Sequence, residues 1–293
     1  MEDLTPAPPP RNRHVTRRRV LGFLAAGTAA AIAYPFYCDP RWLDVTRHSV
    51  LLHGKKLGDA VRVLHLSDLH ASLVVPMDMI DHAVTAAIAQ KPDVICLTGD
   101  YVTNGHHVDN AAYIKVLSRL STAAPTFAVL GNHDARGTIW TPYRKVHGDH
   151  HIVDGILRDS GIEILHNRST QVQVRDARLT LVGVGDLWTH EVDGTRAFAG
   201  VDVNHPTLLL AHNPDTKDVV GQHPWDLMLS GHTHGGQVRI PLEGSAFAPV
   251  KDKRYVAGLK PWEGRQIFVT RGVGNIDGVR FRCRPEVSVL DLA

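Results

Sequence analysis

The stretch Leu229-Ser-Gly-His-Thr-His-Gly-Gly-Gln237 places two histidines, His232 and His234, between a short apolar run and a pair of glycines. If residues 226–230 form a strand, both histidines lie where that strand ends and the backbone turns. Glycine allows positive φ and a close approach of the backbone to a ligand, and imidazole is the commonest metal ligand near neutral pH. Taken alone, such a pair is better explained by two exposed or hydrogen-bonded histidines, so its meaning depends on the other strands.

Other predicted strands end in residues of the same kind. Apolar runs at 61–67, 94–98 and 126–130 alternate with helical periodicity at 77–90 and 109–120, which predicts parallel strands joined by crossover helices. A further run covers residues 207–211. The residues that follow these four runs are all potential metal ligands: Asp68 with His70, Asp100, Asn132 and His212.

Each of these residues also has an ordinary structural explanation. Asp68 and Asp100 could cap helices, Asn132 could hold a left-handed turn, and His212 could be a hydrogen-bonded core histidine. In open α/β sheets, however, the ligand site lies beyond the carboxyl ends of the strands. Five coincidences at five strand ends therefore favour one shared metal site.

The second half of the chain is richer in strands and sets the fold class. Further strands are predicted at 162–165, 171–174, 179–184, 226–230, 266–270 and 287–292, with a hairpin turn at 175–178. We predict an α/β fold in which residues 41–293 form one domain of two packed sheets with helices outside.

The ligand types indicate which metals bind. The set holds two carboxylates, one amide oxygen and four imidazoles without a thiolate, which suits Mn, Fe or Zn and disfavours a structural zinc site. Seven side chains exceed the needs of one ion with an open position, so two ions sharing a carboxylate, ~3.5–4 Å apart, are expected. Such a pair lowers the pKa of a bridging water and neutralises charge on a phosphoryl group. The predicted chemistry is phosphoester hydrolysis by a metal-bridging hydroxide.

The motifs Asp68-x-His70, Gly99-Asp100, Gly131-Asn-His-Asp134, His212 and Gly231-His-x-His234 resemble, in order, those of the calcineurin-like metallophosphoesterase superfamily. The arginines and apolar segment near the N-terminus, Gly235-Gly-Gln237 and residues 279–286 are similar to a bacterial branch of exported or membrane-associated phosphodiesterases. The resemblance implies a four-layer α/β/β/α sandwich of two mixed sheets flanked by helices.

The resemblance also implies a role for each motif residue. The first metal would be held by Asp68, His70 and His234, and the second by Asn132, His212 and His232. Asp100 would bridge the two ions. His133 would contact the phosphate and protonate the leaving oxygen, and Asp134 would orient the His133 imidazole.

The predicted function is therefore that of a binuclear metal-dependent phosphodiesterase. One alternative within the class is a membrane-associated pyrophosphatase that acts on UDP-2,3-diacylglucosamine, as a related branch does, and release of UMP would identify it. Another alternative is a non-catalytic metal-binding module of the cell envelope, which would take up metal without turnover.

Residues 1–40 are predicted to lie outside the catalytic domain. Five arginines precede an apolar segment, Leu21–Tyr37, that carries no charge. This pattern fits a signal peptide cleaved after Ala31-Ile-Ala33, and Thr16-Arg-Arg-Arg-Val-Leu21 is similar to a twin-arginine export signal. It equally fits an uncleaved membrane anchor. Both place the domain outside the cytoplasm, at the bacterial inner membrane, in the periplasm or at the cell exterior.

Charge and cysteine content restrict the partners. The chain carries +2, of which residues 1–33 contribute +3, which leaves −1 for the remainder. That remainder lacks the basic footprint of a nucleic-acid-binding protein, so we expect no specific nucleic-acid partner. The expected partners are small-molecule or lipid substrates, and the protein is expected to be a monomer. Three scattered cysteines are too few for a disulfide framework.

Some residues keep two interpretations at this point. A third metal site at His147, His150 and His151 competes with a surface helix and loop over residues 140–159. Arg280 could contact phosphate through both of its terminal nitrogens or pair with Glu286. Residues 183–188 could line a substrate cleft or form a plain turn.

Overall fold

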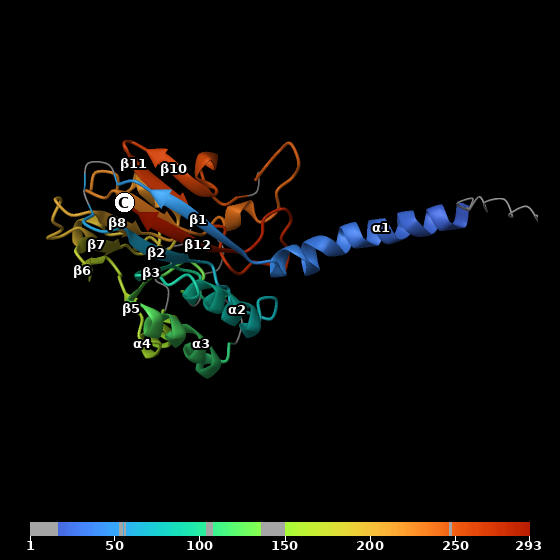
Figure 1. Cartoon of the computed structure of the whole chain (residues 1–293), viewed down its shortest axis with the longest axis horizontal. Coiled ribbons are helices and arrows are strands. Elements are labelled where there is room, and N and C mark those ends of the chain that lie inside the picture. Colours follow the sequence, from blue (N-terminus) through green and yellow to red (C-terminus); the bar gives the residue numbers. More distant parts are fainter. Residues whose placement is uncertain (1–16, 53–54, 56, 104–107, 136–149, 246–247) are drawn as a thin grey trace, which may run out of the picture.

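The computed structural model describes residues 17–52, 55, 57–103, 108–135, 150–245 and 248–293. Two six-stranded mixed sheets pack against each other, and helices lie outside them (Figure 1). This is the predicted α/β/β/α arrangement.

The first sheet carries the strands predicted from the apolar runs in the N-terminal half. Its order is β1-β12-β2-β3-β4-β5, in which β2 to β5 run parallel and β12 is antiparallel to β2. Strands β3 and β4 are buried at every residue, as expected for parallel strands covered on both faces. The strand bounds are β1 Asp44–Val50, β2 Val61–Leu66, β3 Val94–Thr98, β4 Thr126–Val129, β5 Glu163–Ile164 and β12 Glu286–Leu292.

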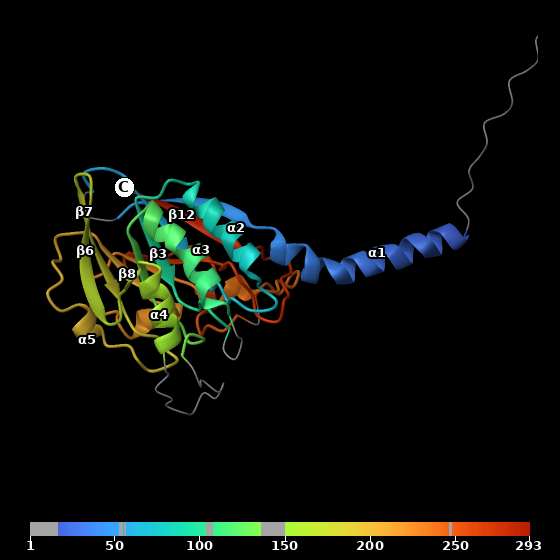
Figure 2. The same cartoon turned by 90° about the horizontal axis from the view of Figure 1, so that it is seen from below.

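Three helices cover the outer face of this sheet, α2 (Met77–Ile88), α3 (Asn110–Ala123) and α4 (His151–Asp159) (Figure 2). Asp109 caps α3, because its side chain accepts the Ala112 N–H at 3.1 Å. Apolar side chains of the helices and the sheet form one core cluster.

The second sheet has the order β10-β11-β9-β8-β7-β6. Its outer layer is thin and consists of short helical segments, α5 (Gly194–Ala197), η2 (Pro214–Asp218) and η4 (Lys253–Tyr255). Ala197 of α5 and Tyr255 of η4 contribute with Trp225 to another apolar cluster. The strand bounds are β6 Arg168–Val174, β7 Ala177–Gly183, β8 Thr207–Leu210, β9 Leu227–Ser230, β10 Gly258–Trp262 and β11 Arg265–Val269.

The space between the sheets is filled by a third apolar cluster, with Phe127 from the first sheet and Leu179, Leu208 and Leu229 from the second. Burying one such side chain stabilises the fold by roughly 1.5–3 kcal/mol. This interface fixes the position of one sheet relative to the other, and therefore of the loops at their ends.

Two strands are absent from the predicted set, β1 and β10. Both lie at sheet edges, where exposed positions alternate with half-buried ones in β1 and Lys260-Pro261 is exposed in β10. Edge strands do not need an apolar run, and they tolerate proline because one side makes no ladder hydrogen bonds. The apolar run that reveals the central strands is therefore missing from both edge strands.

The N-terminal helix α1 (Arg17–Tyr37) extends away from the sheets, and the short η1 (Asp39–Arg41) follows it (Figure 1). Residues Val20–Arg41 form a helical span long and apolar enough to cross a membrane, by length and composition alone. A domain boundary at residue 40 stays a prediction.

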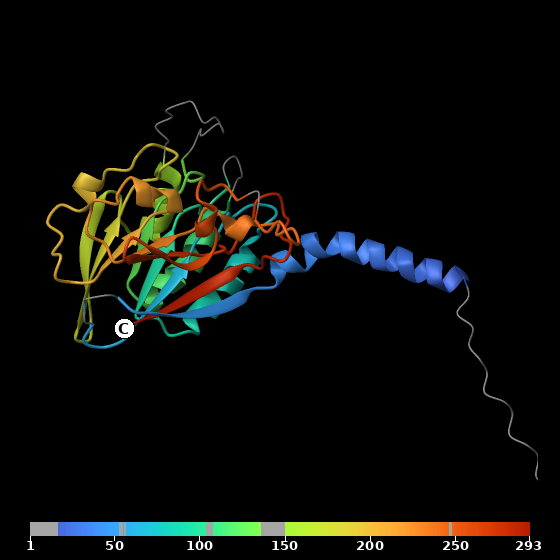
Figure 3. The ribbon, with the colours of Figure 1, turned by 90° about the horizontal axis from the view of Figure 1, so that it is seen from above.

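The topology fixes which end of the sheets α1 joins. Strand β1 starts there and runs parallel to β12, whereas β2 runs in the opposite direction. The carboxyl ends of β2, β3 and β4 consequently lie at the end from which α1 leaves the domain (Figure 3).

Candidate metal centre

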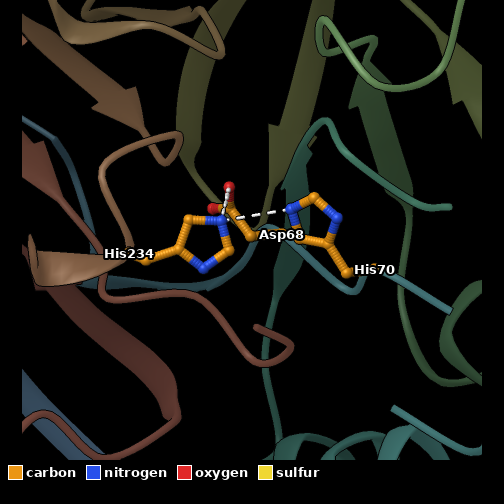
Figure 4. A group of neighbouring side chains, drawn as sticks. All are labelled: Asp68, His70 and His234. Carbon is orange, nitrogen blue, oxygen red and sulfur yellow. Dashed lines mark hydrogen bonds and ion pairs between the residues drawn. The ribbon is translucent and has the colours of Figure 1, made fainter. Parts of the chain in front are cut away.

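Asp68, His70 and His234 come together beyond β2 and β9 (Figure 4). The His234 Nε2 atom lies 3.1 Å from His70 Nε2 and 3.4 Å from Asp68 Oδ1. Two donor atoms that bind one tetrahedral ion at about 2.0–2.1 Å are roughly 3.3 Å apart. The spacing of these three atoms therefore matches a shared cation.

A second group consists of Asp100, His212 and His232. The His212 Nε2 atom lies 3.2 Å from Asp100 Oδ2 and 3.2 Å from His232 Nδ1. The same Asp100 oxygen is 3.4 Å from His70 Nε2, which belongs to the first group. One carboxylate oxygen thus adjoins both groups.

Asn132 lies beside the second group. Its neighbour His133 donates a backbone N–H to Asp100 Oδ1 at 2.9 Å, and the Asn132 side-chain oxygen is buried without a hydrogen-bond partner among the described residues. Such an atom costs about 1–3 kcal/mol of desolvation, which a metal ion would offset. The residues present therefore fit a pair of cations.

The backbone at the ligands adopts a conformation that few residues other than glycine adopt. Asp68, His70, Asp100, His232 and His234 all have φ between 48° and 67°. Left-handed φ in a residue with a Cβ costs of the order of 1–3 kcal/mol and clusters at functional sites. The turns after β2, β3 and β9 are strained in order to aim these side chains.

Two glycines are required by the close packing of these turns. A Cβ on Gly231 would overlap Ser67 Oγ and Asp68 Oδ2, and a Cβ on Gly131 would overlap Asp100 Oδ1. In both cases the space belongs to a carboxylate of the centre, so larger side chains are excluded.

Other hydrogen bonds hold the ligands in place. Asp68 accepts the His232 backbone N–H at 3.0 Å, which joins a turn of one sheet to a turn of the other. His212 Nδ1 lies 2.7 Å from the Thr98 carbonyl oxygen, and His70 Nδ1 lies 3.2 Å from Thr103 Oγ1. Such partners fix the ring orientation of metal-binding histidines.

Burial and neighbouring charges set the protonation states of His232, His234 and Asp100. Burial lowers the pKa of His232 and of His234 well below the ordinary histidine value, so both rings are neutral and offer a lone pair. Burial would raise the pKa of Asp100, but His212 and His133 hold it well below the usual range. Asp100 is therefore an anion at neutral pH.

The sequence comparisons agree with this centre. The family model described as calcineurin-like phosphoesterase matches residues 61–236, which span all seven predicted ligands. Phosphodiesterase YaeI of Escherichia coli (strain K12) is 44% identical over 281 residues, covering 95% of this chain and 99% of that protein. The chain belongs to the calcineurin-like phosphoesterase family. It is a phosphoric ester hydrolase.

Two further relatives of this phosphoesterase align over most of their length. The uncharacterized metallophosphoesterase YkuE of Bacillus subtilis (strain 168) is 27% identical, with coverage of 96% of this chain and 98% of that protein. The UDP-2,3-diacylglucosamine pyrophosphatase LpxG of Chlamydia muridarum (strain MoPn / Nigg) is 25% identical, with coverage of 87% and 90%.

The phosphoesterase places His133 beside the centre, half-buried, with its ring centroid 5.0 Å from that of His70. Burial lowers the pKa of His133, so the free ring is neutral near pH 7. It can donate a hydrogen bond to a phosphoryl oxygen, and an anionic substrate would raise its pKa toward the protonated form.

Asp134 holds backbone groups instead of the His133 ring. Its Oδ2 accepts the N–H groups of Asp100 and Gly131 at 2.8 Å each, and its Oδ1 accepts that of Tyr101 at 2.7 Å. The expectation that Asp134 orients the His133 imidazole is therefore corrected. Within the described residues its carboxylate braces the turns that follow β3 and β4.

Arg280 has neither of its two expected roles. The buried guanidinium donates to the carbonyl oxygens of Gly272 at 3.1 Å and Cys283 at 3.0 Å, whereas Glu286 pairs with Arg271 at 3.1 Å. Arg280 thus organises the loop that follows β11.

The candidate third metal site does not form among the described residues. His150 pairs with Glu191 at 3.1 Å, and His151 begins α4 on the surface. His147 lies outside the described residues.

The turn at 183–188 does reach the centre. The Trp188 ring lies edge-on to the His232 ring with centroids 4.3 Å apart, and 38% of Trp188 is exposed. Burial alone would lower the pKa of His212, and the buried Asp186 is among the carboxylates that raise it. The sequence carried a signal for both residues, since they directly follow the carboxyl end of β7.

Proposed function

We propose that this phosphoesterase is a binuclear metal-dependent phosphodiesterase. The observation that carries the proposal is the Asp100 Oδ2 atom, which lies 3.4 Å from a nitrogen of one ligand group and 3.2 Å from a nitrogen of the other. A shared carboxylate of this kind is what two adjacent ions require. YaeI, the relative at 44% identity, is named a phosphodiesterase.

The protein's side chains would hold the metal ions, orient the phosphate and neutralise its charge. When bound, a metal pair supplies Lewis acidity toward phosphoryl oxygens and lowers the pKa of water. His133 hydrogen-bonds the phosphate and gives a proton to the leaving oxygen. The ions, Mn, Fe or Zn, would be held by Asp68, His70 and His234 on one side and by Asn132, His212 and His232 on the other, with Asp100 between the two groups.

The second candidate is a lipid pyrophosphatase. The observation in its favour is α1, which would confine the enzyme to a membrane that holds its substrate, together with the similarity to LpxG at 25% identity. Release of UMP from a UDP-diacylated sugar, without turnover of simple diesters, would select this activity. In both cases we propose that the domain is exported and lies at the outer side of the bacterial inner membrane.

The test is turnover of bis-p-nitrophenyl phosphate by Asp100→Ala and His232→Ala variants. Both should be inactive, because each change removes a proposed ligand. His82→Ala is the matched control, since His82 is exposed on α2 and belongs to neither ligand group. Circular dichroism should show that all three variants fold. Undiminished turnover in both ligand variants would contradict the proposal.

A further inference from the structure

The foot of α1 carries aromatic and arginine side chains that surround the point where the helix joins the domain. We name this group the collar and define it as Tyr34, Phe36, Tyr37, Arg41, Trp42, Arg282 and Arg284. We propose that the collar is a membrane-contact surface that holds the metal-centre end of the domain against an anionic phospholipid bilayer. The inference rests on the proposed phosphodiesterase function and adds that the scissile phosphoester belongs to a lipid headgroup.

The first step is that the foot of α1 is bonded to a loop of the metal centre. The Arg280 backbone N–H donates to the Pro35 carbonyl oxygen at 2.9 Å. Three residues further along, Cys283 Sγ donates to the carbonyl oxygen of the proposed ligand His234 at 3.1 Å. One short segment therefore contacts both α1 and the centre.

The second step is that hydrogen bonds hold this segment beside the centre. The Arg280 guanidinium donates to the Gly272 carbonyl oxygen at 3.1 Å and also to that of Gly274. The Gly274 N–H in turn donates to the Asp68 carbonyl oxygen at 2.6 Å. A continuous series of hydrogen bonds thus runs from the foot of α1 to a proposed ligand, which places the foot of the helix at the metal-centre end of the domain.

The third step is the chemistry of the collar. Phe36, Tyr37 and Trp42 are 46%, 68% and 53% exposed. The Arg284 guanidinium lies 3.5 Å from the centroid of the Trp42 ring, and that of Arg41 lies 6.0 Å from the centroid of Tyr37. Aromatic rings and arginines beside the end of an apolar helix are typical of the membrane–water interface, where the rings sit at headgroup level.

The charge of the collar fits anionic headgroups. Arg41 and Arg282 are exposed. The acidic residues nearby are engaged, since buried Asp39 accepts the Arg282 backbone N–H and the Tyr34 hydroxyl, and Asp44 lies 3.6 Å from Arg284. Two collar arginines therefore stay exposed beside the helix, where an anionic surface attracts them.

Two loops beside the collar add exposed apolar side chains. Leu73 is 87% exposed and Leu242 is fully exposed. The loop of Leu242 is joined to the segment at Phe281, which bridges with Val238. The loop of Leu73 reaches the same segment through Val74, which would be 3.4 Å from a Cβ on Gly278. Single exposed leucines are ordinary, but around an apolar helix they extend a surface suited to the headgroup–acyl boundary.

The partner that contacts the collar is a bilayer, because α1 has the length and composition of a membrane-spanning helix. The helical span Val20–Arg41 is 22 residues long, and none of its apolar 18-residue window is buried. At ~1.5 Å per residue such a span is about as long as the hydrocarbon core of a bilayer is thick.

Depth-dependent quenching tests the orientation in the full chain. In a Cys38→Ser background, where the remaining cysteines are buried, Leu242→Cys and Leu73→Cys carry an environment-sensitive fluorophore in vesicles of phosphatidylcholine and phosphatidylglycerol. Asp176→Cys is the matched control, because the neighbouring Arg175 pairs with Asp93 at the amino end of β3, opposite the centre. Brominated lipids should quench the labels at 242 and 73 but not at 176. Equal quenching at all three positions, or none at 242 and 73, would overturn the proposal.

A kinetic comparison separates this inference from the phosphodiesterase proposal. The full-length chain and a Tyr37→Ser/Trp42→Ser variant are assayed with soluble bis-p-nitrophenyl phosphate and with vesicles that carry a phosphatidyl p-nitrophenyl ester. We expect the variant to keep soluble turnover and to lose turnover on vesicles. Equal vesicle turnover by the two chains would overturn the membrane-contact proposal. If neither chain hydrolysed the soluble diester, the phosphodiesterase proposal would be overturned. The quenching pattern would still test membrane contact independently.

Discussion

Five of the seven proposed ligands occupy left-handed backbone conformations, and two glycines leave room for the carboxylates beside them. This arrangement explains why ligands from distant parts of the chain meet with cation spacing. At these five positions the strained backbone points side chains into the centre, and the core between the sheets offsets its cost.

Gly231→Ala should therefore damage the first ligand group without changing any ligand. The added methyl group overlaps Ser67 and Asp68, and relief of the overlap requires a backbone shift that costs about 1–3 kcal/mol. Metal content and turnover should both fall. Gly155→Ala, where the added Cβ meets nothing within 4 Å on helix α4, is the control. Full metal content in Gly231→Ala would show that the close packing is unimportant.

His133→Ala should separate proton transfer from metal binding. His133 touches Asp100 through its backbone N–H, which alanine retains, so metal content should be unchanged. Loss of a general acid lowers kcat by ~10²–10⁴. Loss of metal in this variant would instead place the ring among the ligands.

Sequence reasoning could predict the candidate ligands because each follows a strand, and a sheet brings the ends of its parallel strands to one edge. It assigned Asp134 the wrong partner because neighbouring residues in a tight turn need not point at each other. The Asp134 side chain turns back toward the backbone of the turn that follows β3. The role of Arg280 was equally inaccessible, since its guanidinium donates mainly to carbonyl oxygens, which every residue has.

Among the secondary-structure elements, the start of β12 joins three parts of the fold through Glu286. Its carboxylate accepts the Thr46 hydroxyl of β1 at 2.5 Å and the Arg271 backbone N–H after β11 at 2.8 Å. Burial would raise the pKa of Glu286, but Arg271 holds it below its usual value. Because the folded-state pKa is depressed, this carboxylate stabilises the fold above its unfolded pKa, and the stabilisation is lost as the pH falls through the folded value.

Glu286→Gln should consequently be less stable than the natural chain at pH 7, by about 1.5–3 kcal/mol for charged hydrogen bonds. The difference should disappear in acid, where Glu286 is protonated. Urea unfolding at a series of pH values measures it. The Glu263→Gln variant, which changes an exposed turn residue, is the control for any stability that is lost because metal dissociates in acid. A stability difference independent of pH would refute the role of the Glu286 charge.

The central strands were predictable because their apolar runs are buried on both faces, and β1 and β10 escaped prediction because edges need no such run. Helix periodicity was informative for the same reason. It located α2 and α3, whose buried residues, such as Ile80 and Leu117, face one core. A central strand or a core-facing helix can thus be recognised from its own apolar pattern. The burial of an edge strand depends instead on neighbouring strands that are distant in the sequence.

Across the whole molecule, the proposed metals bind residues of both sheets. Asp68, His70, Asp100 and Asn132 follow strands of the first sheet, and His212, His232 and His234 follow strands of the second. Ions that bind only the folded chain stabilise it by about 2.7 kcal/mol at a hundredfold excess over Kd. A chelator should therefore lower Tm by about 5–10 °C for a chain of this size. An unchanged Tm after proven metal removal would mean that the sheets do not share the ions.

Titration of metal-free protein with Mn²⁺, with turnover of bis-p-nitrophenyl phosphate followed at each addition, tests the binuclear centre most directly. We expect activity to rise to its plateau only at two equivalents per chain and to stay absent in Asp100→Ala, because one carboxylate oxygen adjoins both ligand groups. Full activity at one equivalent, or activity that survives without metal, would contradict the binuclear centre.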